Sequence, residues 1–235
     1  MPMRQCLVTG GNRGLGLEFV RQLLARGDAV IATARAPDNA DDLQALVRAH
    51  RGQLQVFPLD VAQPASQSAL ARALPEALAE SGRIDLLVNN AGVLASGERF
   101  GDIRMEALDA SFRTNAAGPL LLTQALAPLL ANNAVVANIS SQLGSIENTT
   151  RFGTPSYGIG KAAQNMATRL LAVALAERGI AVVALHPGWV QTDMGGAGAS
   201  ITPQQSVQGL LKVIDSASLT SSGHFLDWRG IALPW

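Results

Sequence analysis

The feature that most constrains this chain is a regular alternation of short apolar runs with longer segments that carry apolar residues at helical spacing. Seven apolar runs are short enough to be buried strands, near 6–9, 30–33, 54–59, 86–89, 135–140, 181–185 and 224–226. Six helical patterns accompany them, at 14–26, 41–51, 64–81, 102–131, 156–178 and 203–215. Strands that alternate with helices predict an α/β fold, a doubly wound and mostly parallel seven-stranded sheet with helices on both faces.

The composition agrees with such a fold. A length of 235 residues is enough for one sizeable α/β core, so we expect a single domain over residues 1–235. Apolar residues make up 48% and charged residues 15% of the chain, as expected when strands are buried on both faces. Lys plus Arg equals Asp plus Glu at 18 each, so no basic surface predicts binding to nucleic acid or an anionic membrane. We therefore expect small molecules or further copies of the chain as partners.

No targeting or membrane-spanning segment is predicted. The first four residues lead directly into the first strand, and glycines soon interrupt the apolar run. Residues 119–131 are strongly apolar but fall short of the roughly 20 residues that cross a bilayer. The single cysteine, Cys6, lies in the first strand, where an inert buried thiol is favoured over a disulfide or a metal ligand. We expect a cytoplasmic protein.

A glycine-rich turn, TGGNRGLG at 9–16, separates the first predicted strand from the first predicted helix. Glycines permit positive φ and a close approach of the backbone to a pyrophosphate, and the amides at a helix start attract its negative charge. A tight loop without a ligand would also explain glycines. The position between strand and helix favours a phosphate-binding turn.

Three more polar or glycine-containing motifs follow predicted strands. They are Asn89-Asn90-Ala91-Gly92 after the fourth strand, Ser140-Ser141 after the fifth and Pro187-Gly188 after the sixth. The carboxyl ends of parallel strands meet at one edge of a sheet, where ligands of open α/β sheets bind. The sequence therefore predicts a ligand site assembled from four strand ends.

Tyr157 and Lys161 lie four residues apart at the start of a predicted helix. Side chains at this spacing share one helix face. A lysine charge held close favours the phenolate, so we expect the pKa of Tyr157 to lie below its usual value of about 10. Such a tyrosine could exchange a proton with an alcohol or a carbonyl. The same spacing also occurs by chance on solvated helices, so the pair gains its meaning from the other motifs.

Together these motifs resemble the short-chain dehydrogenase/reductase family, over nearly the whole chain. The matching set is Thr9-Gly-x-x-x-Gly14-x-Gly16, Asp60, Asn89-Asn-Ala-Gly92, Asn115, Ser141, Tyr157-x-x-x-Lys161 and Pro187-Gly188. Residues 139–146 and 227–235 resemble a branch of small carbonyl reductases that includes sniffer-type and C-factor-like proteins. The resemblance implies one Rossmann-type three-layer domain and a hydride transfer between a nicotinamide and a small carbonyl or alcohol.

The resemblance also implies four catalytic residues. Tyr157 would be the general acid/base that delivers a proton to the substrate oxygen, and Ser141 would polarise the substrate carbonyl. Lys161 would hold the nicotinamide ribose and lower the tyrosine pKa, while Asn115 would complete a proton relay. Because the hydride belongs to the cofactor, these residues would contribute positioning and electrostatics.

Three serines follow the fifth predicted strand closely enough to polarise the carbonyl, Ser140, Ser141 and Ser145. A lone serine after a strand is more often a turn or cap residue. We take Ser141 as the candidate, and the choice among the three stays open from the sequence.

The end of the second predicted strand favours NADP(H) as cofactor. Proteins that select NAD usually place a carboxylate there to bind the adenine ribose, whereas this segment reads ATAR at 32–35. Arg35 and Arg13 could clamp a 2′-phosphate with their guanidinium groups.

By resemblance, Asp60 would bind the adenine amino group, although an ordinary helix-start aspartate is the alternative, and Thr192 would bind the carboxamide. The expected cofactor contacts are Gly10, Asn12, Arg13, Gly14, Leu15, Gly16, Arg35, Asp60, Val61, Asn90, Ala91, Gly92, Tyr157, Lys161, Pro187, Gly188, Val190 and Thr192.

Two local features make further predictions. Pro119 lacks an N–H, so the carbonyl of Asn115 four residues earlier would lose its helical partner. Our hypothesis is that Gly118-Pro119 opens the helix and that this carbonyl binds a water leading toward Lys161; the alternative is a simple kink.

The glycine-rich tract at 195–200 predicts a mobile lid that orders when substrate binds.

The substrate itself cannot be read from the sequence. Trp189, Leu143 and Phe152 could line an apolar pocket or be core residues. The three histidines lack metal-ligand spacing, so no metal is expected. A homodimer or homotetramer through the long helices at 102–131 and 156–178 is usual in the family, and we expect one of these.

Two other classes of protein stay open. The chain could be an NADP-binding signalling or sensor protein with little or no turnover, as the C-factor resemblance permits. It could also be a sugar-nucleotide epimerase or dehydratase, which uses a tyrosine-lysine pair as well. Few residues remain after Gly188 for the larger substrate domain that those enzymes need.

Overall fold

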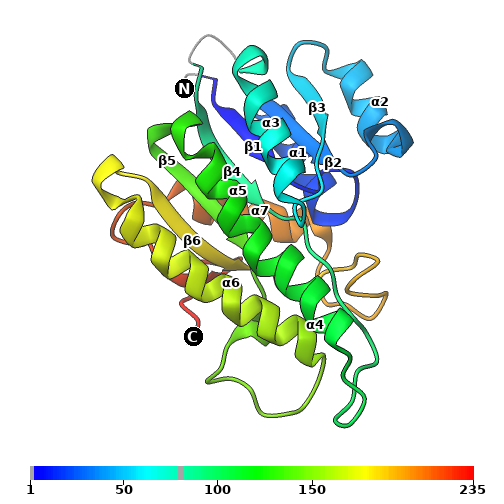
Figure 1. The fold of residues 1–235 in the computed structure, drawn as a ribbon. Helices are drawn as coiled ribbons and strands as arrows, with labels where there is room; N and C mark the ends of the chain where they lie inside the picture. Colours follow the sequence, from blue (N-terminus) through cyan, green and yellow to red (C-terminus); the bar gives the residue numbers. More distant parts are fainter. Residues whose placement is uncertain (1–2, 79–81) are drawn as a thin grey trace.

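The computed structural model describes residues 3–78 and 82–235, and Figure 1 shows a twisted sheet with helices on both faces. Seven strands form the sheet: β1 Gln5–Val8, β2 Ala29–Ala34, β3 Leu54–Pro58, β4 Ile84–Asn89, β5 Leu130–Ile139, β6 Ala181–His186 and β7 Phe225–Asp227. The α-helices are α1 Gly14–Ala25, α2 Asp41–Ala49, α3 Pro64–Ala77, α4 Met105–Phe112, α5 Gly118–Leu126, α6 Pro155–Ala174 and α7 Pro203–Asp215. A π-helix, η2 Arg113–Ala117, joins α4 to α5, and short 3₁₀ turns are η1 Pro37–Asn39, η3 Ala127–Leu129, η4 Gln142–Gly144 and η5 Ala176–Arg178.

The strand order is β3-β2-β1-β4-β5-β6-β7, and every neighbouring pair is parallel. The chain runs outward from β1 to β3, returns to place β4 beside β1, and then runs outward again to β7. The order reverses between β1 and β4, and ligands of open α/β sheets bind outside the carboxyl ends of such strands. The predicted fold class is therefore confirmed, with a sheet that is parallel throughout.

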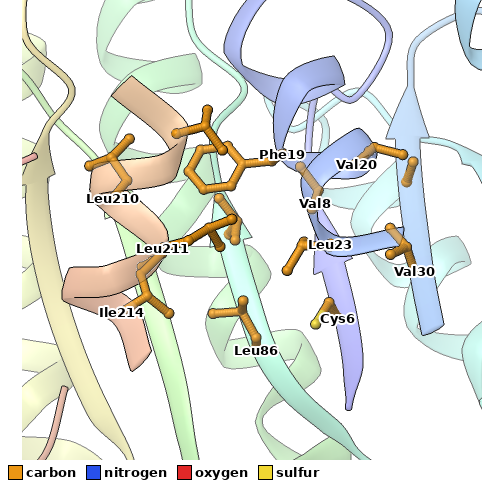
Figure 2. Packing of buried hydrophobic residues seen from close by; sticks show 14 of the residues in the cluster. Cys6, Val8, Phe19, Val20, Leu23, Val30, Leu86, Leu210, Leu211 and Ile214 are labelled. Atoms are coloured by element: carbon orange, nitrogen blue, oxygen red, sulfur yellow. The ribbon is translucent and has the colours of Figure 1, made fainter. Parts of the chain in front are cut away.

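Alternating side chains of the central strands build two cores. In β1, Cys6 and Val8 face one core while Leu7 faces the other. Helices α1 and α7 cover the first core, and Figure 2 shows their side chains over those of β1, β2 and β4: Phe19, Val20 and Leu23 from α1, and Leu210, Leu211 and Ile214 from α7. Helices α3, α5 and α6 cover the second core. Burial on both faces explains why the strands are apolar without a polar alternation.

The long helix predicted at 102–131 is wrong as a single element. The structure divides it into α4, the π-helix and α5, with a 3₁₀ turn at the end. Pro119 and Pro128 each lack the N–H that a continuous α-helix would use, and α5 ends before Pro128. The predicted break at Gly118-Pro119 is therefore confirmed, and the break at Pro128 was missed.

Strand β5 begins five residues earlier than predicted, at Leu130 instead of Val135. Ile84 pairs with Leu130 and Leu86 with Val135, so β5 carries a bulge, with Asn133 at φ 64°. Asn132 and Asn133 lie in this bulge, between the predicted helix and the predicted strand. Helix α3 ends at Ala77, and the end of the helix predicted at 64–81 lies outside the described residues.

Within residues 3–78 and 82–235, none of the helices has the length and apolar character required to traverse a lipid bilayer.

Candidate active site

The glycine turn is shaped by backbone that only glycine tolerates. Gly10 and Gly14 adopt φ of +65° and +53°. A Cβ added at Gly16 would lie 2.0 Å from the carbonyl oxygen of Gly10 and 2.5 Å from the amide nitrogen of Asn90. The first turn of α1 has no hydrogen bond from its cap side chain and no acidic residue, so its free N–H groups are left for a ligand. This cradle fits the pyrophosphate of a dinucleotide, the group that the sequence predicts here.

The segment after β4 is tied to the glycine turn. Thr9 Oγ1 accepts hydrogen bonds from the backbone N–H groups of Asn90 and Ala91, each at 3.0 Å. Asn90 Nδ2 donates to the carbonyls of Thr9 and Gly10 at 2.9 and 3.2 Å. The side chain of Asn90, predicted as a cofactor contact, therefore fastens the two strand ends together.

Asn115 is fully buried in the π-helix and is bound to the chain that follows β4. Its Oδ1 accepts from Val93 N at 2.9 Å, and its Nδ2 donates to Val93 O at 2.8 Å and to Ser111 Oγ at 3.0 Å. The N–H of Gly118 donates to the carbonyl of Arg113, five residues earlier, which is the π-helical pattern. The side chain of Asn115 is thus structural, and only its backbone carbonyl is a candidate for a relay.

The three candidate serines are separated by their partners. Ser140 Oγ donates to Asn165 Oδ1 at 2.6 Å, and Ser145 Oγ donates to the carbonyl of Pro234 at 2.8 Å. Ser141 Oγ accepts from the N–H of Leu143 at 3.2 Å, and its side chain hydrogen-bonds to the hydroxyl of Tyr157. Of the three, Ser141 is the serine that meets the tyrosine.

Tyr157 and Lys161 share the inner face of α6, and both are buried. Lys161 Nζ lies 5.7 Å from the centroid of the tyrosine ring. It donates to the carbonyl of Ile139 at 2.7 Å and to Oε1 of Gln164 at 3.0 Å. The ammonium is therefore bound at the end of β5 and is not hydrogen-bonded to the phenol.

The prediction that Lys161 lowers the pKa of Tyr157 is wrong for this arrangement. Burial raises the pKa of Tyr157 to about 12, and the hydrogen bond from Ser141 opposes only part of that rise. Burial likewise lowers the pKa of Lys161 to about 7. Desolvation disfavours the charged form of each group, and it is the largest cause of both shifts.

Gly92 lies between the catalytic candidates. A Cβ at this position would be 3.0 Å from Asn115 Oδ1 and 3.8 Å from Lys161 Nζ. Glycine thus keeps the space beside the lysine open at the carboxyl end of β4. A Cβ on Gly10 would contact Ala91, which precedes Gly92, so Ala91 packs directly against the glycine turn.

The predicted cofactor contacts farther from Tyr157 lie along the same edge. Arg35 follows β2 directly and is exposed, as is Arg13. Arg13 forms a 3.0 Å ion pair with Asp193, which follows β6. Asp60 Oδ1 accepts from the N–H of Ala62 at 2.9 Å, the local turn that an aspartate before a helix commonly makes. Asn12 and Leu15 are partly exposed on the glycine turn, whereas Val61 is buried.

The chain after β6 returns to the glycine turn. A Cβ on Gly14 would lie 3.5 Å from Cγ2 of Thr192, so these two segments are in contact. Thr192 Oγ1 accepts from the N–H of Gly195 at 3.2 Å, and Val190 is buried. Pro187 is half-buried and Gly188 adopts φ +84°. The predicted strand-end motifs therefore lie along the carboxyl edge of the sheet, and those after β4 and β6 lead into segments that contact the glycine turn.

The tract at 195–200 is held by several hydrogen bonds. Trp189 Nε1 donates to the carbonyl of Gly195 at 2.8 Å, and the N–H of Gly196 donates to the carbonyl of Thr192 at 2.8 Å. The carbonyl of Trp189 accepts from the N–H of Ser200 at 3.0 Å. A mobile lid stays a prediction.

The three apolar residues that could line a pocket are all exposed, so none of them is a core residue: Trp189, Leu143 and Phe152.

Two contributors to the site were missed from the sequence. Helix α6 begins after Thr154, which has φ 43° and no side-chain cap, and Glu98 supplies the cap from the segment after β4. One Glu98 oxygen accepts from Ser156 N at 3.2 Å, and the other accepts from Ser156 Oγ. The second contributor is Gln164, which binds Lys161. No local sequence pattern marks a cap that is 58 residues away.

Comparisons with known proteins agree with this geometry. The sequence model described as short chain dehydrogenase matches residues 4–200. The C-signal protein of Myxococcus xanthus is 42% identical over 157 residues, which cover 66% of this chain and 95% of that protein. An NADPH-bound carbonyl reductase from chicken fatty liver is 40% identical, with a TM-score of 0.93 and full coverage of both chains. The carbonyl reductase Sniffer of D. melanogaster is 31% identical, with a TM-score of 0.93 over 99% of this chain and 100% of that chain. The resemblance to this branch is confirmed, and the chain belongs to the short-chain dehydrogenase family.

Proposed function

We propose that the protein is an NADP(H)-dependent oxidoreductase that interconverts a small carbonyl compound and its alcohol. The observation that carries the proposal is the hydrogen bond between Tyr157 and Ser141 at the carboxyl edge of the sheet, with Lys161 Nζ 5.7 Å from the centre of the tyrosine ring. Two hydroxyl groups that converge on one point can both address one substrate oxygen. The same proposal treats residues 1–235 as one catalytic domain, because α7 and β7 complete the layers of the same fold.

The cofactor assignment rests on two observations. The related chicken carbonyl reductase was solved with NADPH bound. In this chain, Arg35 is exposed directly after β2, and Arg13 is exposed on the glycine turn, where it pairs with Asp193. Both guanidinium groups could contact a 2′-phosphate. Bound NADPH would supply the hydride. The glycine turn would hold its pyrophosphate, and Lys161 its nicotinamide ribose.

In the reducing direction, Tyr157 donates its proton to the substrate oxygen while Ser141 donates a hydrogen bond to the same atom. The raised pKa of Tyr157 keeps the phenol protonated at neutral pH, which is the form that a proton donor requires. We assign Asn115 to the relay through its backbone carbonyl, since its side chain is bound to Val93 and Ser111. In this proposal a water on that carbonyl passes a proton toward Lys161.

A screen of aldehydes, ketones and quinones, followed by loss of NADPH absorbance, tests the proposed activity. Turnover of at least one class is expected, and Tyr157→Phe should reduce it by about 10³-fold with little change in NADPH affinity. Undiminished turnover in this variant would contradict the role of Tyr157. A high-resolution structure in which the Asn115 carbonyl accepts a hydrogen bond from a protein donor would contradict the proposed relay.

A second candidate function is NADP-dependent signalling with little turnover, because the 42% identical relative is named C-signal. The two candidates differ in what they require of the tyrosine. A sensor would keep its signalling output in the Tyr157→Phe variant, whereas an oxidoreductase would lose its turnover. The presence of all four catalytic residue types favours the enzyme.

We also propose that the protein is cytoplasmic and self-associates through α6. Four exposed apolar residues lie along one face of this helix: Ile159, Met166, Leu170 and Val173. Their spacing of seven, four and three residues makes a continuous stripe. A Leu170→Lys variant should therefore dissociate a dimer or tetramer in light scattering, and an unchanged mass would place the interface elsewhere.

A further inference from the structure

The ammonium of Lys161 is buried with neutral partners only. Its two acceptors are the carbonyl of Ile139 at 2.7 Å and Oε1 of Gln164 at 3.0 Å. Lys161 forms no ion pair within residues 3–78 and 82–235. Burying a charge is costly unless it is paired or well hydrogen-bonded. These two oxygen atoms are its hydrogen-bond acceptors, and the Tyr157 ring, 5.7 Å from Nζ, adds a weaker contact to the cation.

Gln164 is an unusual residue to find beside this cation. It is 1% exposed, and its Nε2 has no hydrogen-bond partner among the described residues. A buried N–H without an acceptor costs free energy, so an apolar residue would pack here at lower cost. Exchanging the amide oxygen and nitrogen would point a donor at the ammonium of Lys161. The unpartnered nitrogen is thus the consequence of keeping an acceptor on the lysine.

We propose that Gln164 is a positioning residue that keeps Lys161 in its charged, three-donor form at the catalytic site. The inference rests on the proposed function, in which Lys161 binds the nicotinamide ribose. A protonated lysine has three N–H donors. Ile139 and Gln164 take two of them, which leaves the third for a ribose hydroxyl. A neutral amine would lack this spare donor.

The surroundings of Lys161 make the acceptor important at physiological pH. Burial lowers the pKa of Lys161 to about 7, so its charge is close to being lost. The groups that face it are the phenol of Tyr157 on α6, the amide of Asn115 on the π-helix and the carbonyl of Ile139 on β5. Of these only the phenol titrates, and its pKa of about 12 keeps it neutral. A hydrogen bond to the charged form opposes the effect of burial.

The experiment is a carbon-13 NMR titration of lysine Cε in the whole protein. Lys161 and Lys212 are the only lysines of the chain, and Lys212 is an exposed internal reference on α7. Gln164→Met removes the oxygen acceptor with little change in shape and should move the midpoint of Lys161 down by about one to two pH units. Gln164→Glu places a carboxylate oxygen at the same position and should move the midpoint up. The midpoint of Lys212 should stay fixed in both variants.

Thr168→Val is the matched control. Thr168 Oγ1 donates to the backbone carbonyl of Gln164 at 2.9 Å, so it is buried in the same network but does not contact the ammonium. This variant should lose stability and leave the Lys161 midpoint unchanged. An unchanged midpoint in Gln164→Met and Gln164→Glu, or an equal shift in Thr168→Val, would overturn the inference. If Gln164→Met does not fold, the direction of the shift in Gln164→Glu decides alone.

NADPH affinity, measured against pH in the same variants, separates this inference from the proposed function. The pH at which affinity declines should follow the Lys161 midpoint in each variant. A midpoint that moves as expected in a protein that neither binds NADPH nor reduces carbonyls would reject the proposed function only. An active enzyme whose Lys161 midpoint is the same in all variants would reject the role of Gln164 only.

Discussion

The nucleotide end and the catalytic end of the candidate site are built in opposite ways. At the nucleotide end, eight consecutive residues supply a cradle of backbone N–H groups, and glycines give it its shape. At the catalytic end, buried side chains from the π-helix, the end of β5 and α6 converge on one point. A backbone site is local and tolerates no added atom. A side-chain site is assembled over distance and depends on every partner that offsets desolvation.

The two ends also differ in what they cost the fold. The glycine turn requires positive φ and close contacts, which glycine adopts without strain. The catalytic end requires a lysine and a tyrosine in an interior that disfavours their charged forms. Stability and function should therefore conflict at the catalytic end and agree at the nucleotide end. The four predictions below test this difference, from the largest expected effect to the smallest.

Lys161→Met should raise the free energy of unfolding at pH 7 and below by about 5 kcal/mol at most. The folded pKa of about 7 lies below the usual value of 10.5, so the unfolded chain binds more protons between these pH values. The stability of the unmodified protein should therefore rise with pH from 7 toward 10.5, and the variant should lose this rise. Urea unfolding at several pH values measures both effects. Lys212→Met, at an exposed lysine, is the control, and an equal slope in Lys161→Met would contradict the prediction.

Gly16→Ala should destabilise the protein by about 3 kcal/mol and abolish cofactor binding, because the new Cβ would overlap the carbonyl of Gly10. Thermal unfolding and binding titrations with NADPH measure the two effects. Gly153→Ala is the control, since the nearest neighbour of its Cβ would be 4.0 Å away. Tight NADPH binding by Gly16→Ala would show that the cradle does not hold the pyrophosphate.

Arg35→Asp should reverse the cofactor preference, lowering the ratio of NADP to NAD affinity by about 100-fold. The guanidinium group attracts a 2′-phosphate, whereas a carboxylate repels it and accepts hydrogen bonds from ribose hydroxyls. Binding constants for both cofactors at one salt concentration measure the change. Arg104→Asp, at another exposed arginine, carries the same change in net charge and should leave the ratio as it is. A similar loss of affinity for both cofactors would remove Arg35 from the clamp.

Ser141→Ala should raise the pKa of Tyr157 further, by about one unit, because the hydrogen bond from Ser141 lowers it. Tyr157 is the only tyrosine of the chain, so tyrosinate absorbance after a rapid pH jump reports this residue alone. Ser140→Ala removes the neighbouring hydroxyl, which is bound to Asn165, and should leave the midpoint in place. Equal midpoints in the two variants would argue against a direct bond between Ser141 and Tyr157.

Much of the nucleotide end could be predicted because its signal is local. The glycine turn, its place between β1 and α1 and the strand-end motifs all follow from residues close in the sequence. The break at Gly118-Pro119 was predictable for the same reason, since a proline acts on the turn that precedes it. The bulge in β5 was not predicted, because it is defined by the register of β5 against β4, a strand that lies far away in the sequence.

The sequence indicated the candidate catalytic residues as residue types, but it did not indicate their electrostatics. Spacing alone placed Lys161 near Tyr157 and suggested that the cation would make the phenol acidic. Burial reverses that expectation, and its extent is set by the surrounding strands and helices. The contacts of Glu98 and Gln164 with the site could not be predicted from the sequence either. One comes from a distant segment, and the other resembles any polar residue of a helix.

By itself, the sequence determined the class of fold, the order of motifs along one sheet edge and the residue types at the site, because these depend on hydrophobic periodicity and backbone chemistry that act over a few residues. The tertiary structure alone decided which serine meets Tyr157, where the ammonium of Lys161 is bound and how far burial shifts both pKa values. Hydrogen-bond partners and desolvation depend on which distant segments come together, and spacing along one chain does not contain that information.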